Sequence, residues 1–311
     1  MAKKKKDAPD PDSIIAAHGG VGQWETGVAS GVARGSFPRF PGGEGPGEVY
    51  LCRAGLPPYD SDVEMLAAWL DAPRTSVGAV NLLGEPGVGK TALAEAVATF
   101  RGQDMTTVVC TPDHTKESLF LRFVGEGRGE GGSPFALGPF PHAAKNGDLL
   151  YVDEAMLLND ETQPALYALC DGRPYLPEGN VDGTALKIHP DFRVLLSSNP
   201  NVRGASMPEP LASRTAGTTV VLKTDANFLR DLGIEETLVA AWEALETAEL
   251  WRPQVRELLA ANYWMPLNPA QAVAAMVGEH CPSSSRLEVT TIVANLLTSG
   301  EVQPDGRLVI S

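Results

Sequence analysis

The sequence predicts an α/β fold: a parallel sheet of five buried strands separated by helical segments, with a smaller helical domain after it. Five short apolar runs, each bounded by turn or polar residues, predict the strands: 79–83, 106–110, 149–152, 194–197 and 218–222. Helical segments separate these runs, which is typical of strands buried in a parallel sheet. After Asp225 the apolar residues recur at helical spacing only, which predicts the second domain.

The composition agrees with two intracellular domains. The chain has 311 residues, 43% of them hydrophobic, which is enough for a sizeable core. Its net charge of −14 opposes a sequence-independent grip on nucleic acid. The four cysteines lie far apart and form no CxxC pair, which favours a reduced protein without structural zinc. No apolar run reaches the roughly 20 residues that span a bilayer, so we expect a cytoplasmic protein that does not enter a membrane.

Residues 1–47 are expected to be irregular. The opening MAKKKKDAPDPD carries four lysines, which suit either a basic arm for nucleic acid or anionic lipid, or a solvated end; the acids and prolines that follow favour the solvated end. Residues 19–47 hold ten glycines and three prolines with little apolar periodicity. The folded body is therefore expected to begin near Glu48.

The remaining elements follow in chain order. Apolar residues at helical spacing predict a helix over 61–70, and an alanine-rich helix is expected over 91–100. Two glycine-rich interruptions, 123–140 and 173–188, are interpreted as protruding hairpins or loops. In the C-terminal domain one helix face is formed by Leu238, Ala241, Trp242 and Leu245, and another by Ile292, Val293, Leu296 and Leu297. The aromatic residues expected in the core of this domain are Trp242, Trp251, Tyr263 and Trp264.

The stretch GEPGVGKT lies between the first strand and its helix, at residues 84–91. In such a turn the backbone N–H groups point at phosphate oxygens, and glycine permits the close approach. An accidental glycine turn is the alternative, but the flanking strand and helix both fit the functional interpretation. We expect Lys90 at the β- and γ-phosphates of ATP and the Thr91 hydroxyl on Mg²⁺. The predicted nucleotide-binding residues are Gly84, Glu85, Pro86, Gly87, Val88, Gly89, Lys90 and Thr91.

The run LLYVDE delivers two carboxylates to the end of a buried strand. Asp153 is expected to bind nucleotide-bound Mg²⁺ through water, and Glu154 to polarise the attacking water. A helix cap or a solvated turn is the alternative. Adjacent Asp and Glu after a phosphate-binding turn favour hydrolysis of ATP over phosphoryl transfer to a small molecule.

Three further polar residues are candidates for the same reaction. Asn199 ends the run VLLSSNP, where its amide can orient the water, although an Asn before Pro is also an ordinary turn. Arg214 ends EPLASR and is either a surface residue or an arginine finger for a neighbouring subunit. Arg286 lies in the first turn of a helix, where a cation is unfavourable unless a phosphate compensates it; an exposed arginine is the alternative.

Taken together, these motifs resemble the AAA+ ATPases of the MoxR group, most closely the CbbQ, NorQ and GvpN branch. The resemblance covers residues 50–299 and rests on GEPGVGKT, GDLLYVDEAMLLNDETQPALYAL, HPDFRVLLSSNP, PLASR and SSSRL. It implies a P-loop NTPase αβα sandwich with a helical lid. By position, Lys90 and Thr91 correspond to Walker A, Asp153 and Glu154 to Walker B, Asn199 to sensor 1, Arg214 to the arginine finger and Arg286 to sensor 2. The two hairpins match the helix-2 insert and the pre-sensor-1 hairpin.

The resemblance implies an Mg-ATP-dependent ATPase that forms a ring, usually hexameric, and remodels a protein client, often with a von Willebrand factor A domain partner. The threonine after Arg214 departs from the apolar residue usual there. An ATP-driven DNA machine, such as a helicase loader or phage replication factor, and a nucleotide-dependent binding switch are the alternatives. The net charge opposes the first and the intact Glu154 the second. The expected domains are 48–224 for the ATPase core and 225–299 for the lid, with 300–311 as a tail.

Overall fold

The computed structural model describes residues 27–29, 35–44, 48–200 and 207–299. These residues form two compact units. The first comprises 27–29, 35–84 and 90–222; the second comprises 85–89 and the chain from 223 onward. The predicted lysine run and C-terminal tail lie outside the described residues. No described helix is long and apolar enough to cross a membrane.

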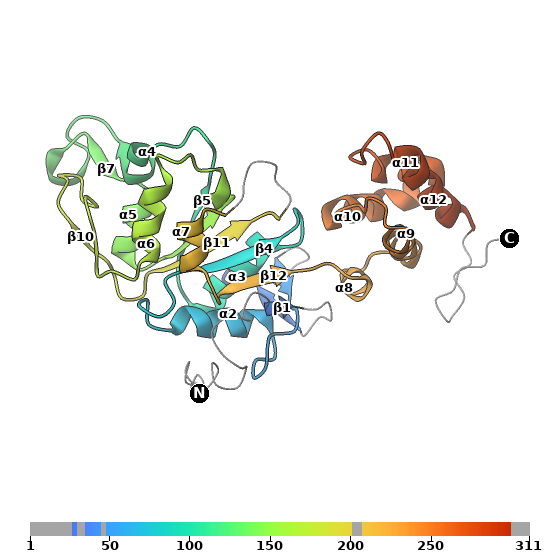
Figure 1. Cartoon of the computed structure of the whole chain (residues 1–311), viewed down its shortest axis with the longest axis horizontal. Coiled ribbons are helices and arrows are strands. Elements are labelled where there is room, and N and C mark those ends of the chain that lie inside the picture. Colours follow the sequence, from blue (N-terminus) through green and yellow to red (C-terminus); the bar gives the residue numbers. More distant parts are fainter. Residues whose placement is uncertain (1–26, 30–34, 45–47, 201–206, 300–311) are drawn as a thin grey trace. The chain divides into compact units, whose positions relative to one another are not determined.

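A parallel sheet organises the first unit (Figure 1). The strands are ordered β1-β12-β4-β11-β8-β5, and each pairs in parallel with its neighbour. Their bounds are β1 Gly27–Ala29, β4 Val80–Gly84, β5 Met105–Val109, β8 Leu149–Asp153, β11 Arg193–Ser198 and β12 Thr219–Leu222. All five predicted strands are present, within a residue or two of their expected ends. Because the strands are parallel, their carboxyl ends meet at one edge of the sheet.

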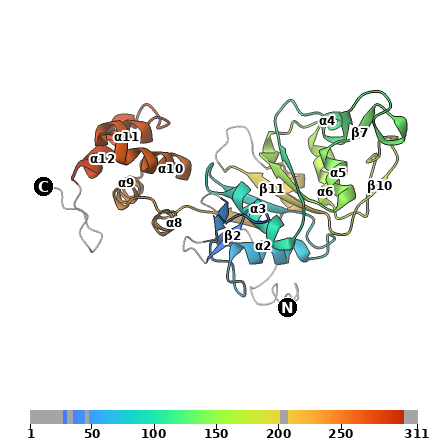
Figure 2. The same cartoon turned by 180° about the vertical axis from the view of Figure 1, so that it is seen from behind.

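Helices cover both faces of this sheet, which confirms the α/β sandwich (Figures 1 and 2). Buried side chains of α5 (Pro139–Asn146) and α6 (Gln163–Cys170) share one apolar core with β8 and β11. The helices α2 (Asp62–Asp71) and α3 (Lys90–Arg101) pack together and contact β4, and α3 also contacts β8. The helix α2 begins where the sequence predicts, because Ser61 is its N-cap and the Ser61 hydroxyl accepts a hydrogen bond from the Glu64 N–H at 3.2 Å.

The segment predicted to be irregular carries two short strands. Gly27–Ala29 forms β1 and adds a sixth strand to the sheet beside β12, so the expectation of five strands is one short. Ser36–Pro38 forms β2 and pairs antiparallel with β3 (Val49–Leu51). Both missed strands have three residues, too few to show the alternation by which strands are found in a sequence.

Both predicted hairpins are present. The first pairs β6 (Leu121–Phe123) with β7 (Phe135–Leu137), after the short helix α4 (Lys116–Phe120) and around the 3₁₀ turn η1 (Glu130–Gly132). The second pairs β9 (Tyr175–Leu176) with β10 (Leu186–Lys187). Lys116 and Glu178 form an ion pair that joins α4 to the second hairpin.

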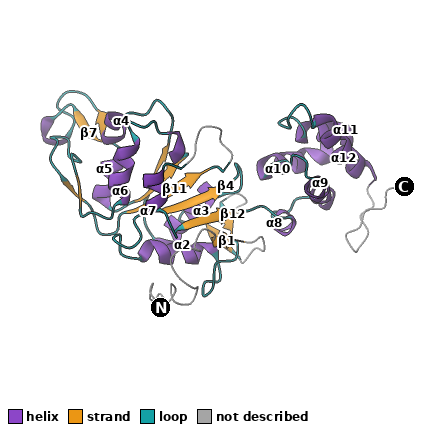
Figure 3. Ribbon diagram, in the orientation of Figure 1, coloured by secondary structure: helices purple, strands orange, loops and turns teal. Residues whose placement is uncertain are grey.

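The described part of the second unit after residue 222 contains helices and no strand (Figure 3). The helices are α8 Ala226–Asp231, α9 Glu236–Thr247, α10 Val255–Trp264, α11 Ala270–Val277 and α12 Arg286–Ser299, with the 3₁₀ turn η3 Met265–Leu267. Both predicted helix faces contribute to one core. The aromatic prediction is half right: Trp242 is buried and Trp251 packs on the core, but Tyr263 and Trp264 are 68% and 42% exposed. Only the first pair lies on faces that other helices cover.

Candidate active site

The GEPGVGKT turn joins the carboxyl end of β4 to the first residue of α3. Gly87 and Gly89 have φ angles of 83° and 97°, a conformation that side chains with a Cβ rarely adopt. The Val88 N–H donates to the Glu85 carbonyl at 3.3 Å and tightens the turn. The first turn of α3 carries no acidic side chain, so nothing on that turn opposes an anion at this helix start.

Lys90 is buried with its ammonium at the carboxyl edge of the sheet. It is 8% exposed, and its Nζ donates to the Gly84 carbonyl and to Asn199 Oδ1, each at 2.7 Å. The other end of the Asn199 amide, Nδ2, donates to Glu154 Oε1. Three predicted site residues from three separate motifs therefore form one hydrogen-bonded chain, which we call the Lys90–Asn199–Glu154 relay.

Glu154 reaches this relay from an unusual backbone conformation. Its φ and ψ angles of 54° and 39° are left-handed, which costs a residue with a Cβ about 1–2 kcal/mol. The residue stands between the end of β8 and the 3₁₀ turn η2 (Ala155–Leu157). Its own carbonyl accepts from the Leu157 N–H at 2.9 Å, and its carboxylate is held by Asn199. Strained backbone of this kind concentrates at functional sites.

Asp153 and Thr91, the two predicted Mg²⁺ residues, are joined through Tyr151. The Tyr151 hydroxyl donates to Asp153 Oδ1 at 3.3 Å and lies 3.3 Å from the Thr91 hydroxyl. Asp153 Oδ1 also accepts from the Ser197 hydroxyl, and from the Glu154 N–H at 3.1 Å. All of these bonds reach Oδ1, so Oδ2 has no hydrogen-bond partner among the described residues. A carboxylate and a hydroxyl are oxygen ligands that suit Mg²⁺, which takes further ligands from water and phosphate.

Tyr151 and Ser197 are site residues that the motif analysis missed. Each lies two positions before a predicted site residue, Tyr151 before Asp153 and Ser197 before Asn199. Since side chains alternate along a strand, that spacing puts Tyr151 on the same face of β8 as Asp153, which it supports, whereas Ser197 reaches Asp153 from the neighbouring strand β11. Alternation within β8 therefore contained the signal for Tyr151.

Burial sets the protonation of the groups around these carboxylates. Burial, above all, raises the pKa of Tyr151, so its hydroxyl keeps its proton and remains a hydrogen-bond donor. Cys110 follows β5 and its N–H donates to the Asp153 carbonyl at 2.9 Å. Burial, with Asp153 and Glu154 nearby, raises the pKa of this thiol to about 12. Cys110 is thus an inert thiol beside the site, because a thiolate is the reactive form.

Arg214 lies outside the relay, at the end of α7 (Glu209–Arg214). Its Nε donates to Asp171 Oδ1 at 2.5 Å, and its Nη1 donates to the Pro210 carbonyl at 2.7 Å. The guanidinium carbon stands 5.2 Å from the ring centre of Tyr167 on α6. These hydrogen bonds reach no relay residue, and the role of Arg214 as an arginine finger stays a prediction.

Arg286 lies in the second unit and opens α12, as predicted. Its Nη2 donates to the backbone carbonyls of Glu279 and Cys281, at 3.0 and 3.1 Å. The charge at this helix start is therefore compensated by carbonyl oxygens of the preceding turn. Arg286 is thus held by its own unit, and its expected contact with a phosphate stays a prediction.

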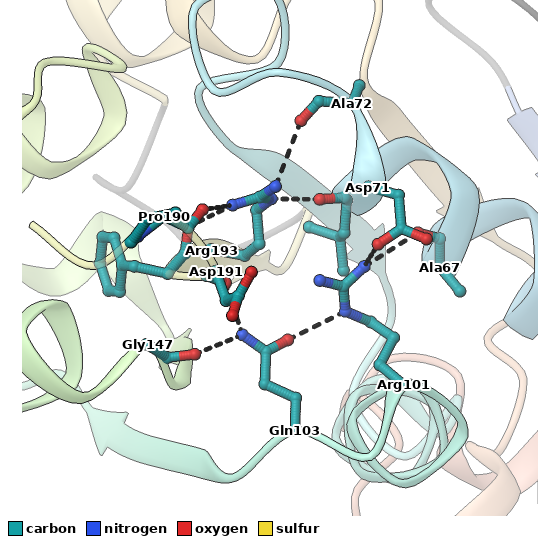
Figure 4. A network of polar contacts seen from close by, with 11 residues as sticks. Ala67, Asp71, Ala72, Arg101, Gln103, Gly147, Pro190, Asp191 and Arg193 are labelled. Carbon is teal, nitrogen blue, oxygen red and sulfur yellow. Dashed lines mark hydrogen bonds and ion pairs between the residues drawn. The ribbon is translucent and has the colours of Figure 1, made fainter.

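A cavity of about 490 Å³ lies at the opposite edge of the sheet, where β5 and β8 begin. Its lining includes Gln103, Asp104, Asp148 and His189. Beside it Gln103 Nε2 donates to the Gly147 and Asp191 carbonyls at 2.6 and 2.7 Å, and Arg193 Nη2 donates to the carbonyl of Ala72, which follows α2, at 3.5 Å (Figure 4). These bonds tie loops together. Ligands of open parallel sheets bind at the carboxyl edge, so this cavity is separate from the candidate site.

Comparison with known proteins identifies the domain that carries this site. Residues 79–215 match the family described as AAA domain (dynein-related subfamily). Protein CbbQ of Hydrogenophilus thermoluteolus is 32% identical over 124 residues, 40% of this chain and 45% of that protein. An uncharacterized protein of Staphylococcus aureus strain USA300 is 30% identical over 168 residues, 53% of this chain and 63% of that protein. The chain thus spans between 45% and 63% of the length of these two relatives.

Among solved structures, a putative ATPase of Cytophaga hutchinsonii is similar to this chain. It has 18% sequence identity and a TM-score of 0.40, with 75% of this chain and 81% of that chain covered. The family match carries the assignment instead, since it spans every motif from GEPGVGKT to the arginine of PLASR. Residues 79–215 are therefore similar to the AAA domain of the dynein-related subfamily, and the predicted resemblance of the chain to AAA+ ATPases of the MoxR group is confirmed.

Proposed function

We propose that the chain hydrolyses Mg-ATP at the GEPGVGKT turn and uses the cycle, as a ring, to remodel a protein client. The observation that carries the proposal is the Lys90–Asn199–Glu154 relay. It connects a buried cation at a phosphate-binding turn to a carboxylate through one amide. Such a chain links phosphate binding to water activation, which are the two tasks of an ATPase site.

Each residue has a defined task in this mechanism. Lys90 exchanges its bond to Asn199 for phosphate oxygens and neutralises their charge. Glu154, held by Asn199 Nδ2, accepts a proton from the water that attacks the γ-phosphate. Thr91 and Asp153 would hold Mg²⁺, which supplies charge neutralisation at the β- and γ-phosphates when it is bound. Tyr151 keeps Thr91 and Asp153 in register.

The ring, its client and the partner protein are proposals supported by the resemblance to CbbQ and the MoxR group. Hexameric assembly would bring Arg214 of one subunit to the nucleotide of the next. The proposed core, 48–224, and lid, 225–299, would move against each other during the cycle. A partner with a von Willebrand factor A domain would present the client, and the reaction would take place in the cytoplasm, where ATP is supplied. The net charge of −14 supports a protein client over DNA.

Phosphate release by the purified chain tests the proposal. We expect Mg²⁺-dependent turnover whose specific rate rises with protein concentration as rings form, followed in parallel by light scattering. Lys90→Ala should weaken binding of a fluorescent ATP analogue, whereas Glu154→Gln should bind it normally and lose turnover by about 100-fold or more. Glu154→Gln turnover at the wild-type rate would remove the assigned role. Stimulation by DNA would favour a DNA machine, and binding without turnover in the wild type would favour a switch.

A further inference from the structure

The side chain of Arg214 is held by a small cluster on α6 and α7, the Asp171 cluster, which consists of Tyr167, Asp171, Arg173, Pro210 and Arg214. Asp171 directly follows the last residue of α6. Its side chain is 16% exposed and bridges two arginines, with Oδ1 2.5 Å from Arg214 Nε and Oδ2 3.1 Å from Arg173 Nη2. An ion pair with a largely buried carboxylate constrains a side chain more than a fully exposed pair does.

The cluster fixes one side of the Arg214 guanidinium. Nε is bound by Asp171, one Nη1 donor is bound by the Pro210 carbonyl at 2.7 Å, and the plane is supported by the ring of Tyr167. The Tyr167 hydroxyl donates to Gln163 Oε1 at 2.7 Å, which in turn fixes the ring. Of the five donors of a guanidinium, those on Nη2 make no hydrogen bond to a described residue.

We propose that Asp171 is a positioning residue that presents the Nη2 end of Arg214 to the phosphate of ATP bound in a neighbouring subunit. The inference rests on the proposed function, because only a ring supplies such a neighbour. A long, flexible arginine loses conformational freedom when it engages a phosphate, and a side chain already held in place loses less. Asp171 thus acts on turnover through Arg214 and touches no nucleotide itself.

The variant Asp171→Asn tests this role, since it keeps the side-chain shape and removes the charge. We expect rings assembled from Asp171→Asn subunits to have a kcat lower on the order of 10- to 100-fold, because small misplacements of catalytic groups have effects of this size. The KM for ATP should stay within about two-fold, because binding in the subunit's own site is untouched. Asp71→Asn is the matched control, since it makes the same substitution in the ion pair with Arg101 at the opposite edge of the sheet and should leave kcat unchanged.

Mixed assemblies separate positioning from general damage. Asp171→Asn subunits keep an intact nucleotide site but offer a poorly held Arg214, whereas Lys90→Ala subunits keep the Asp171 cluster and lose their own site. Mixing the two should therefore restore turnover above the sum of the separate samples. Absence of that gain in mixed rings verified by native mass spectrometry would overturn the inference. Asp171→Glu, which keeps the charge, should retain more activity than Asp171→Asn and serves if the latter fails to assemble.

The outcomes distinguish the inference from the proposed function. If Arg214→Ala hydrolyses ATP at the wild-type rate, or if the wild-type rate does not depend on assembly, the proposed function fails. If the rate of ATP hydrolysis depends on Arg214 and on assembly but Asp171→Asn matches the wild type, only the role of Asp171 fails. A faster Asp171→Asn would show that the ion pair restrains Arg214, which would also overturn the positioning role.

Discussion

At the scale of single residues, the site depends on side chains that never touch the nucleotide in the proposed mechanism. Tyr151 is the main example, because its hydroxyl stands 3.3 Å from both Thr91 Oγ1 and Asp153 Oδ1. Removal of the Tyr151 hydroxyl keeps Thr91 and Asp153 but removes the hydrogen bonds that connect them. The effect should therefore appear in the metal requirement before it appears in ATP binding.

Tyr151→Phe is expected to raise the Mg²⁺ concentration for half-maximal turnover by about 10-fold or more, as loss of a supporting hydrogen bond does at other metal sites. Titration of phosphate release with Mg²⁺ measures this. Affinity for ATP without metal should be unchanged. Tyr167→Phe, which also loses a tyrosine hydroxyl but lies on α6, is the control. Equal Mg²⁺ dependence in wild type and Tyr151→Phe would contradict the link.

A second residue-scale prediction concerns Asp62, which opens α2 and is fully buried. Tyr50 donates to its Oδ2 at 2.7 Å and the Arg53 N–H to its Oδ1 at 3.1 Å. Burial outweighs these partners and raises the pKa of Asp62 from 3.8 to about 6. The folded state therefore holds the Asp62 proton more tightly than the unfolded state. The stabilisation from this proton is complete below pH 4 and is lost as pH rises through 6.

Asp62→Asn should remove this pH dependence. The free energy of unfolding of the wild type relative to the variant should fall by roughly 2 kcal/mol between pH 4 and pH 6, since each pKa unit is worth about 1.4 kcal/mol and part of the 3.8-to-6 shift lies outside this window. Urea unfolding at several pH values measures it. Asp60→Asn, at an exposed position two residues earlier, should follow the wild type. A constant difference across this range would show that Asp62 titrates normally.

At the scale of elements, two glycines that follow helices have the same left-handed backbone conformation but different surroundings. Gly147 ends α5 in the left-handed conformation, with φ 86°, and a Cβ there would lie 2.4 Å from His189 Nδ1. Gly102 follows α3 with φ 63°, and a Cβ there would meet nothing within 4 Å. The two positions share the backbone conformation and differ in what surrounds them.

Gly147→Ala should therefore destabilise the first unit more than Gly102→Ala. Backbone strain alone costs about 1–2 kcal/mol at either position, and displacement of the His189 ring adds to it only at Gly147. Thermal unfolding of both variants gives the comparison. Equal losses of stability would mean that His189 moves aside without cost.

The same scale shows what a sequence can and cannot predict. The five strands and α2 and α3 were found because each is a continuous apolar run or a helical repeat bounded by turn residues. The strand β1 was missed, since three residues in a glycine-rich stretch show no pattern. The motifs predicted the three members of the relay because each motif follows a strand of the sheet at its carboxyl edge, but the hydrogen bonds between the members were not predicted. The partner of Arg214 was out of reach, because Asp171 lies 43 residues away and meets it only through the packing of α6 on α7.

At the scale of the whole molecule, the open question is whether nucleotide changes the second unit. Arg286 is bound to the carbonyls of Glu279 and Cys281, so a contact with γ-phosphate requires these bonds to be exchanged. In that case ATP would order the start of α12 more than ADP does. If Arg286 only holds the preceding turn, its loss would affect both nucleotide states equally.

We expect ATP, more than ADP, to slow amide hydrogen exchange in α12, and Arg286→Ala to remove most of that difference. Exchange followed by mass spectrometry with saturating nucleotide measures both. Arg230→Ala, which removes an arginine bound to Glu236 on α9 in the same unit, is the control and should keep the difference. Equal protection by ATP and ADP in the wild type would leave Arg286 with a structural role alone.

The relay also fixes the orientation of the Asn199 side-chain amide. Its carbonyl oxygen accepts from the ammonium of Lys90, and its NH₂ group donates to the carboxylate of Glu154. Rotating that amide by half a turn would set like against like at both ends, so the two flanking charges choose its orientation. A carboxylate of the same shape would repel Glu154, and a hydroxyl is too short to reach both neighbours. Asparagine is therefore the small side chain whose dipole matches the field between this cation and this anion, which makes residue 199 chemically irreplaceable in a way that its position in a turn does not reveal.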